Sequence, residues 1–249
     1  MKLRVLTYNI HRAIGVDRLF RPARVVDVIR SHRPDVVILQ EVDQGVPRSR
    51  ELDMARDLAR ELGFPHRAAG YNVSLRKGRY GNATLSRFPI VRERNIDLTI
   101  GLKKRRGCQH TTIDLGTGSE RPLHLELFNL HLGLSNLERQ RQVGKLIRSP
   151  EFKGMEEGAP CVLAGDFNDW RSVLRFFFIE AFDFRCASDR QTKRGPRAIK
   201  TYPSFSPRGG LDRIYYRGRI ELEGIHRCAH QTSRVASDHL PLIANFRIR

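Results

Sequence analysis

Short hydrophobic runs separated by polar turns dominate the chain, and this pattern predicts β-strands. Many of the runs are rich in Val, Ile, Leu, Thr or aromatic residues, and Gly, Pro or polar clusters bound them. We predict nine strands, at residues 3–10, 35–41, 81–86, 108–115, 123–131, 159–166, 212–216, 220–226 and 240–247.

Hydrophobic residues at helical spacing predict helices between these strands. Pro22 suits the first position of a helix, Ser49 is a candidate N-cap and Gly63 is a candidate terminator. Ser135 and Glu138 have the S-x-x-E spacing of a capping box, in which each side chain binds a free backbone N–H group. We predict four helices, at residues 21–33, 49–62, 136–148 and 170–181.

Strands that alternate with helices predict a layered α/β fold. Because the chain has no repeat, low-complexity tract or linker-like stretch, we expect residues 1–249 to form a single domain. Residues 187–210 are basic and rich in Pro, Gly and Ser, which predicts a long loop, and such loops are often functional or disordered. The three phenylalanines at 176–178 are expected in the core rather than in a ligand-binding platform.

Positive charge is the unusual feature of the composition. The chain has 45 Lys and Arg residues against 27 Asp and Glu residues, a formal net charge of +18. Such a surface attracts nucleic acid, anionic lipid headgroups or phosphorylated small molecules. The alternative is a role in solubility, because the basic residues are spread along the chain and the densest cluster, 103–106, is short enough to be a solvated loop.

Other compositional features bear on location and redox state. No apolar stretch approaches the ~20 residues that span a bilayer. Residues 1–10 are too short in apolar run for a signal peptide and lack a small-residue cleavage site, so we expect a cytoplasmic protein. The absence of any C-x-x-C pair argues against a thiolate zinc site, and wide spacing favours reduced thiols for the four cysteines, Cys108, Cys161, Cys186 and Cys228.

Candidate chemistry lies where four of the hydrophobic runs end. A strand that leaves the core delivers its last side chains to the rim of its sheet, where α/β proteins often place their sites. Four runs end in carboxylates, amides and imidazoles: Asn9 and His11, Glu41 and Asp43, Asn129 and His131, and Asp166, Asn168 and Asp169.

Each of these residues also has an ordinary structural interpretation when taken alone. Glu41 could be the first exposed residue of a loop, and Asp166 could belong to a turn that its own side chain stabilises. His131 would more often be a structural histidine, His11 is assigned a structural role, and Asp212 could be a surface charge. The set together favours a site, because its residue types complement one another.

The combination of residue types indicates a particular chemistry. Several hard oxygen ligands without thiolates favour Mg²⁺ or Mn²⁺ over zinc. Mg²⁺ is commonly held by one or two carboxylates, with water and substrate phosphate completing its shell. An acid beside an amide could activate a water, and histidines could neutralise a phosphoryl oxygen or assist the leaving group. These are the parts of metal-assisted phosphoester hydrolysis, and the basic surface independently favours an anionic substrate.

Seven motifs, spread over nearly the whole chain, resemble those of the endonuclease/exonuclease/phosphatase superfamily. They are TYNIH (7–11), LQEV (39–42), GNATLSRFPI (81–90), NLHL (129–132), GDFN (165–168), LDRIYY (211–216) and SDHLPL (237–242). GDFN followed by SDH is the specific part of the resemblance. That superfamily includes pancreatic deoxyribonuclease, exonuclease-III-type apurinic endonucleases, neutral sphingomyelinases and inositol polyphosphate 5-phosphatases. TYPSFSP at 201–207 looks like the bacterial metal-dependent hydrolase branch.

The resemblance implies a fold and a metal site. The implied fold is a four-layer α/β/β/α sandwich, in which two mixed sheets lie face to face with helices outside. Glu41 would be the principal ligand of Mg²⁺ (or Mn²⁺). Asn9 would support the metal or a phosphate oxygen, and Asp238 would sit near the metal.

The resemblance also implies the catalytic residues. Asp166 would orient and activate the attacking water, and Asn168 would hold the scissile phosphate. His239 would contact the phosphate and the reaction centre, and Asp212 would fix its tautomer, as carboxylates do for histidines elsewhere. His131 would be a second imidazole, acting as a phosphate contact or a general acid.

One position departs from the pattern of the nuclease branch. There a second glutamate orients the histidine that corresponds to His131, and residues 79–86 contain no glutamate. Asn82 is the nearest polar candidate, and we assign it to substrate binding together with Asn168 and His239. The membrane-associating features of sphingomyelinases are absent, and we find no clear platform of aromatic residues for stacking near the motifs.

The sequence therefore predicts a Mg²⁺-dependent phosphodiesterase or phosphatase. Nucleic acid is the leading substrate class because of the charge of the chain, and a phospholipid headgroup or an inositol phosphate is the alternative. A catalytically silent phosphate-binding module is a further alternative. The presence of the expected acids and imidazoles argues against it.

Overall fold

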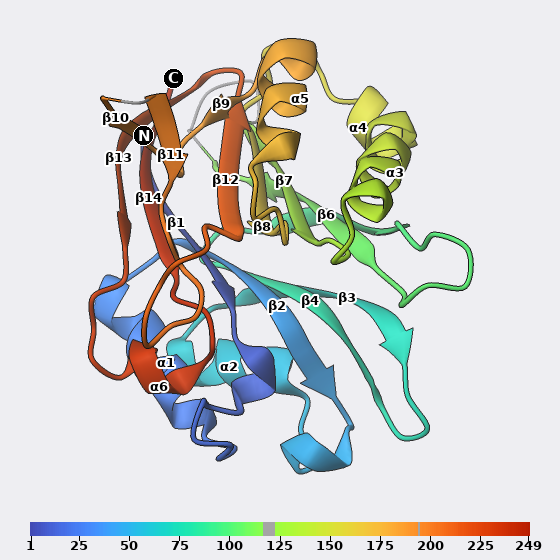
Figure 1. Cartoon of the computed structure of the whole chain (residues 1–249), viewed down its shortest axis with the longest axis vertical. Coiled ribbons are helices and arrows are strands. Elements are labelled where there is room, and N and C mark those ends of the chain that lie inside the picture. Colours follow the sequence, from blue (N-terminus) through green and yellow to red (C-terminus); the bar gives the residue numbers. More distant parts are fainter. Residues whose placement is uncertain (117–122, 194) are drawn as a thin grey trace.

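Two six-stranded β-sheets pack face to face in the computed structural model, which describes residues 1–116, 123–193 and 195–249 (Figure 1). Helices α1 and α2 cover the outer face of one sheet, and α3, α4 and α5 lie on the outer side of the other. The predicted four-layer α/β/β/α sandwich is therefore confirmed.

The first sheet has the strand order β13-β14-β1-β2-β4-β3. Strands β1 and β2 are parallel, and the other neighbouring pairs are antiparallel. Its strands are β1 (Lys2–Asn9), β2 (Val36–Gln44), β3 (His66–Ser74), β4 (Arg79–Ser86), β13 (Ile220–Arg227) and β14 (Leu242–Ile248).

The second sheet has the order β5-β6-β7-β8-β12-β9, again with one parallel pair, β7 and β8, among its described strands. Its strands are β5 (Ile90–Asp97), β6 (Gly107–Asp114), β7 (His124–His131), β8 (Cys161–Asp166), β9 (Arg185–Cys186) and β12 (Asp212–Arg217). A separate hairpin consists of β10 (Asp189–Thr192) and β11 (Gly195–Ala198).

The helices connect and cover the strands. They are α1 (Pro22–His32), α2 (Met54–Leu62), α3 (Asn136–Arg148), α4 (Pro150–Lys153), α5 (Val173–Phe182) and α6 (Ser233–Ala236), with 3₁₀ turns η1 (His11–Ala13) and η2 (Pro47–Ser49). None of these described helices combines the length and the hydrophobicity needed to cross a membrane.

Strand β1 shows how both faces of a sheet are buried. Leu6 and Tyr8 pack among the residues of α1 and α2, whereas Leu3 and Val5 pack between the two sheets. Side chains alternate between the faces of a strand, so a strand with two buried faces reads as a continuous apolar run. This explains why the central strands were predictable from hydrophobicity.

The nine predicted strands are all present, with ends within three residues of those expected. Three strands of the two large sheets were missed: β3, β5 and the two-residue β9. All three lie at sheet edges, and β5 has the mostly exposed sequence IVRERNID. An edge strand with charged side chains carries little hydrophobic signal, because charge protects the edge against pairing with other chains.

The structure corrects the predicted N-cap of α2 and confirms its predicted terminator. Helix α2 begins at Met54, and its N-cap is Asp53, whose side chain accepts from the N–H of Arg56. Ser49 instead lies in η2 and donates to the carbonyl of Val46. Gly63 ends α2 with a φ of 70°, as predicted.

The predicted capping box of α3 is half formed. Ser135 Oγ accepts from the N–H of Glu138, as expected. The Glu138 carboxylate accepts from Gln142 rather than from the backbone of Ser135. A glutamate one turn from a glutamine thus has a competing partner on its own helix.

Residues 187–210, predicted to be a loop, contain the β10–β11 hairpin; residue 194 lies outside the described residues. The phenylalanine run of α5 is divided. Phe178 is buried, as expected, but Phe176 is 69% exposed, because consecutive residues of a helix point in different directions. The four cysteines are free, as predicted.

Candidate active site

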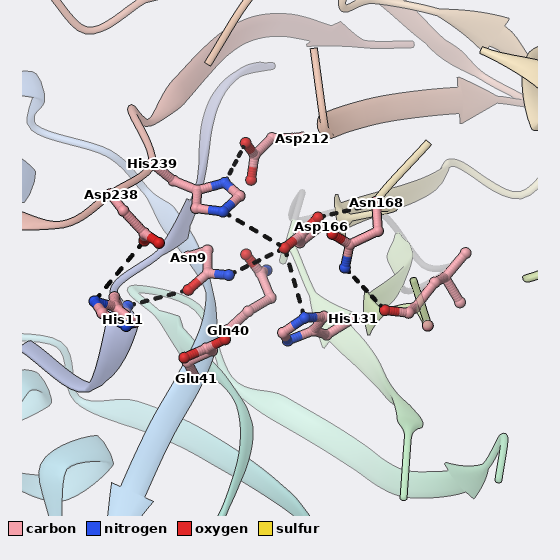
Figure 2. A network of polar contacts seen from close by, with 12 residues as sticks. Asn9, His11, Gln40, Glu41, His131, Asp166, Asn168, Asp212, Asp238 and His239 are labelled. Atoms are coloured by element: carbon pink, nitrogen blue, oxygen red, sulfur yellow. Dashed lines mark hydrogen bonds and ion pairs between the residues drawn. The ribbon is translucent and has the colours of Figure 1, made fainter. Parts of the chain in front are cut away.

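The carboxyl ends of the two parallel strand pairs meet between the sheets (Figure 2). Asn9 Nδ2, at the end of β1, donates to Asp166 Oδ2, at the end of β8, over 3.1 Å. Gln40 Nε2, on β2, donates to Asn129 Oδ1, on β7, over 2.9 Å. These two hydrogen bonds join the parallel pair of the first sheet, β1 and β2, to the parallel pair of the second sheet, β7 and β8.

Asn129 holds the two sheets together behind this place. Its Nδ2 donates to the backbone carbonyls of Leu39 and Ala83, each at 3.0 Å. Asn82, predicted to bind substrate, lies on β4, and its Nδ2 donates to the carbonyl of Asn129 at 3.0 Å. The amide nitrogen of Asn82 is therefore engaged between the sheets, although the residue lines a small cavity together with His131.

Asp166 lies at the centre of the site. Its Oδ1 accepts from the N–H of Asn168 at 2.9 Å. Its Oδ2 lies 3.5 Å from His131 Nε2 and 3.8 Å from His239 Nε2. Burial raises the pKa of this carboxyl, while the His239 imidazole opposes that shift. A carboxylate with a raised pKa is a better proton acceptor.

His239 is oriented by a buried carboxylate, as the resemblance implied. Its Nδ1 lies 2.8 Å from Asp212 Oδ2. Burial acts to lower the pKa of His239, but the carboxylates of Asp212 and Asp166 outweigh it and raise the pKa to about 10. The imidazole is therefore protonated at neutral pH, with Nε2 directed toward Asp166 (Figure 2).

His131 has the opposite electrostatic environment. It is almost fully buried, and burial together with the positive charges of Arg106, His239 and Lys104 lowers its pKa well below the usual value. The neighbouring Asp166 is its closest acidic contact. His131 is therefore a neutral imidazole in this environment.

Asn168 has a strained backbone beside these groups. Its φ is 51°, in the left-handed region that non-glycine residues rarely adopt. Its Nδ2 donates to the carbonyl of Leu132 at 3.0 Å, which ties the segment after β8 to the end of β7. Strain of this kind concentrates at functional sites.

Glu41 reaches the site through an irregularity in β2. The register between β2 and β4 shifts between Leu39 and Val42, and Glu41 has a φ of 57°. Bulges next to active sites commonly redirect a side chain in this way. The Glu41 carboxylate lies 3.3 Å from Arg12 Nε and is partly exposed to solvent.

Asp238 and His11 form the exposed side of the site. Their Oδ1 and Nδ1 atoms are 3.9 Å apart, and Asp238 is about one-third exposed. His11 Nδ1 also lies 2.9 Å from the carbonyl of Ile14, and its N–H donates to Asn9 Oδ1. His11, which lies at the end of a hydrophobic run but was assigned a structural role, is thus part of the site's surroundings.

Within residues 1–116, 123–193 and 195–249, no three His, Cys, Asp or Glu side chains converge as a preformed metal cage. The available donors nevertheless fit a hard cation. Glu41 and Asp238 supply carboxylates accessible to solvent, and Asn9 supplies an amide oxygen beside them. Mg²⁺ needs only one or two carboxylates when water and phosphate complete its shell.

Sequence reasoning missed Arg12 and Gln40. Arg12 follows the TYNIH motif and neutralises Glu41, and the motif alone did not predict its direction. Gln40 did carry a signal, because it is a fully buried amide inside an apolar run, and such groups need a specific partner.

Two acids at the ends of the hydrophobic runs lie outside the site. Asp43 makes two hydrogen bonds with Arg48, at 2.7 and 2.9 Å. Asp169 accepts from the N–H of Leu174 and so stabilises the start of α5. Both serve local structure.

Residues 6–239 match the sequence profile of the Endonuclease/Exonuclease/phosphatase family. The chain belongs to this family. A similar protein, YbhP of Escherichia coli K12, is 29% identical over 254 residues, which cover 98% of this chain and 96% of YbhP. The resemblance inferred from the motifs is confirmed, and family membership makes the chain a phosphoester hydrolase.

Solved structures share the fold of this family member. An endonuclease/exonuclease/phosphatase from Beutenbergia cavernae has a TM-score of 0.77 at 23% identity, over 99% of this chain and 72% of that one. The human Nocturnin catalytic domain with bound sulfate has a TM-score of 0.74 at 21% identity, with coverage of 100% and 94%. Mannosyl-6-phosphatase Bt3783 of Bacteroides thetaiotaomicron has a TM-score of 0.73 at 18% identity, with coverage of 99% and 100%.

Proposed function

We propose that residues 1–249 form one catalytic domain, a Mg²⁺-dependent phosphodiesterase that acts on nucleic acid. The observation that carries the proposal is the position of Asp166, a carboxylate that lies 3.5 Å from the His131 imidazole, whose neutral form is favoured, and 3.8 Å from the His239 imidazole, whose protonated form is favoured. A base beside a fixed positive charge is the arrangement that water attack on a phosphate requires.

Asp166 is proposed to orient the attacking water and accept its proton. Its raised pKa supports this role, and the N–H of Asn168 and the amide of Asn9 fix its two oxygens in place. Asn168 is proposed to hold the scissile phosphate. The hydrogen bond from its Nδ2 to the carbonyl of Leu132 supports this role, because it holds the side chain beside Asp166.

His239 is proposed to stabilise the negative charge that develops on the phosphate. The Asp212 carboxylate holds its protonated ring in one orientation, so the stabilising charge needs no rearrangement during the reaction. His131 is proposed to contact a phosphoryl oxygen as a neutral N–H donor. Its lowered pKa favours this role over that of a general acid.

Glu41, Asn9 and Asp238 are proposed to hold the Mg²⁺ ion. When bound, the ion would supply positive charge to the phosphate and favour loss of the leaving group. The three donors are hard oxygens, as magnesium prefers, and none of them is a thiolate.

The proposed substrate class rests on charge. The chain carries a formal +18, and Arg106, Lys104 and Arg12 are close enough to depress the pKa of His131. A phosphate backbone gains affinity from such a surface by releasing its counterions. The small phosphoester bis-p-nitrophenyl phosphate tests the chemistry alone: we expect hydrolysis with Mg²⁺ or Mn²⁺, and none after thorough treatment with EDTA.

A panel of substrates tests the substrate class. Plasmid DNA, abasic duplex DNA, RNA, sphingomyelin and inositol phosphates should be compared at equal phosphate concentration. The proposal expects the highest kcat/KM on a nucleic acid. A strong preference for sphingomyelin or an inositol phosphate would replace nucleic acid by the alternative substrate class, and activity that survives metal removal would refute the metal-dependent mechanism.

A further inference from the structure

Trp170 is the only tryptophan of the chain, and it follows the GDFN motif at the candidate active site. It is 56% exposed, a large fraction for this residue type in a folded protein. The sequence analysis found no clear platform of stacking aromatic residues near the motifs, yet this ring lies exposed beside one of them.

A chain of ring contacts connects Trp170 to the catalytic centre. The Trp170 and Tyr202 rings pack edge to face, with centroids 5.7 Å apart. The Tyr202 ring in turn lies 5.0 Å from the His239 ring. Trp170 is thus one aromatic ring removed from the imidazole that we propose to contact the phosphate.

The backbone beneath Trp170 fixes its indole. A Cβ atom added at Gly209 would lie 2.6 Å from Trp170 Cζ3, so the ring lies directly against the glycine backbone. Gly209 and Tyr202 are joined by two backbone hydrogen bonds, at 2.8 and 3.0 Å. Because Gly209 has no side chain, the indole of Trp170 can pack against its backbone.

The same loop is tied to both neighbours of His239. The N–H of Ser204 donates to the carbonyl of Asp238 at 2.7 Å. The N–H of Leu240 donates to the carbonyl of Thr201 at 3.0 Å. The indole is therefore held at a defined position relative to the imidazole, with more than half of its surface free.

We propose that Trp170, supported by Tyr202, stacks on the nucleobase of the nucleotide whose phosphate lies at His239. The inference rests on the proposed function and names the part of the substrate that the platform recognises. Every nucleobase has a flat face that stacks on aromatic side chains, and such stacking tolerates any base.

The surroundings of Trp170 favour a nucleobase over a lipid chain. The next residue, Arg171, is an exposed cation, and Ser172 follows it. A lipid-binding surface requires a contiguous apolar patch. A flat exposed ring two residues beyond the GDFN motif, on a chain of charge +18, matches a base attached to a phosphate.

Tryptophan fluorescence tests the contact directly, because the whole signal comes from Trp170. The protein is titrated in EDTA with thymidine 5′-phosphate and, separately, with 2-deoxyribose 5-phosphate, which lacks only the base. We expect saturable quenching by the nucleotide and none by the sugar phosphate. Equal responses to both ligands, or no response to the nucleotide, would overturn the proposal.

A third titration separates the nucleobase from a lipid. Vesicles of phosphatidylcholine and phosphatidylglycerol should leave the emission maximum unchanged. A blue shift with vesicles would mean that the indole enters a membrane, and would overturn the assignment to a nucleobase.

Kinetics of W170A test whether the contact serves catalysis. The substrates are the dinucleotide TpT and two analogues in which a tetrahydrofuran residue replaces one or the other thymidine. We expect W170A to lower kcat/KM for TpT about tenfold, as loss of one stacked base implies, and to leave one of the two analogues unaffected.

Phe176 provides the matched control, because it is an exposed aromatic residue of the neighbouring helix α5. F176A should leave all three rates unchanged. If W170A lowers kcat/KM equally for all three substrates, Trp170 has a structural role. If W170A leaves kcat/KM unchanged for all three, Trp170 does not take part in the reaction. If the wild-type protein cleaves none of them, the proposed function fails, whereas fluorescence still decides the stacking contact.

Discussion

At the level of single residues, the surroundings of the two active-site histidines shift their pKa values in opposite directions. Asp212 and Asp166 keep His239 protonated, while burial and nearby cations keep His131 neutral. The two imidazoles lie on either side of one carboxylate, so each has a different capacity to bind or transfer a proton. Their charge states follow from partners that only the fold brings together.

The pairing of Asp212 with His239 leads to the first prediction. Asp212→Asn keeps the shape of the side chain but removes the charge that orients and protonates the imidazole. We expect kcat on bis-p-nitrophenyl phosphate to fall by about 10²-fold or more, measured at a temperature at which both proteins are folded.

Asp27→Asn is the matched control, because Asp27 lies exposed on α1. It should retain the wild-type rate. A folded Asp212→Asn variant with a wild-type rate would show that Asp212 is not needed to orient His239 for catalysis.

At the scale of elements, the site depends on how two sheets are joined. The amide of Asn129 binds two carbonyls of the first sheet and accepts from Gln40, so one side chain sets the spacing of β2, β4 and β7. Glu41 lies next to Gln40 at the irregular position of β2. The metal-binding carboxylate is thus positioned by buried amides behind it.

Asn129→Ala tests that positioning. The substitution removes three hydrogen bonds and leaves their buried partners unsatisfied, so we expect a loss of about 3 kcal/mol in the free energy of unfolding. Urea denaturation measures the loss. Asn95→Ala, which removes an exposed 3.3 Å bond from Asn72, should change the stability by less than about 0.5 kcal/mol.

The elements also show how far sequence can predict this fold and site. Central strands with two buried faces were visible as apolar runs, and the motifs named most of the polar residues that meet at their ends. The edge strands β3 and β5 were missed because exposed strands need few apolar residues.

Contacts between side chains that are distant in the chain could not be predicted from the sequence. Two such contacts depend on loop conformations that local sequence patterns do not specify. They are the ion pair of Arg12 with Glu41 and the packing of Trp170 against Gly209. The N-cap of α2 was misplaced for a related reason. Both Ser49 and Asp53 are good capping residues, and only the backbone path decides between them.

At the scale of the whole molecule, charge should govern substrate binding. A protein that neutralises several phosphates releases their counterions, so affinity falls linearly with the logarithm of salt concentration. We expect kcat/KM for a DNA oligonucleotide to fall steeply between 50 and 200 mM salt, a range over which such binding weakens strongly. The kcat/KM for bis-p-nitrophenyl phosphate, which carries a single charge, should change little over the same range. Equal salt dependence for both substrates would contradict a role for the +18 charge in recognition.

Stability should decrease in mild acid. His32, at the end of α1, faces His226 across 5.6 Å and Arg4 donates to its carbonyl. Burial, followed by the charges of His226, His230 and Arg4, lowers the pKa of His32 to about 4 from 6.5. The unfolded chain therefore binds the proton more readily, and stability that is complete above pH 6.5 is lost as the pH falls toward 4.

Thermal unfolding of His32→Gln measures this contribution. Between pH 6.5 and 4 the Tm of the variant should fall less than that of the wild-type protein. Identical pH profiles for the two proteins would show that protonation of His32 does not couple to folding.

Glu41→Gln replaces one carboxylate oxygen of the proposed metal ligand by an amide nitrogen and keeps the size of the side chain, so it tests whether this carboxylate holds the metal. With bis-p-nitrophenyl phosphate and saturating Mg²⁺, we predict a rate lowered by about 10²–10³-fold, as for other groups that stabilise charge in a transition state. Glu61→Gln, an exposed residue of α2, should keep the wild-type rate. A folded Glu41→Gln variant that hydrolyses the substrate as fast as the wild-type protein would contradict the assignment of this site.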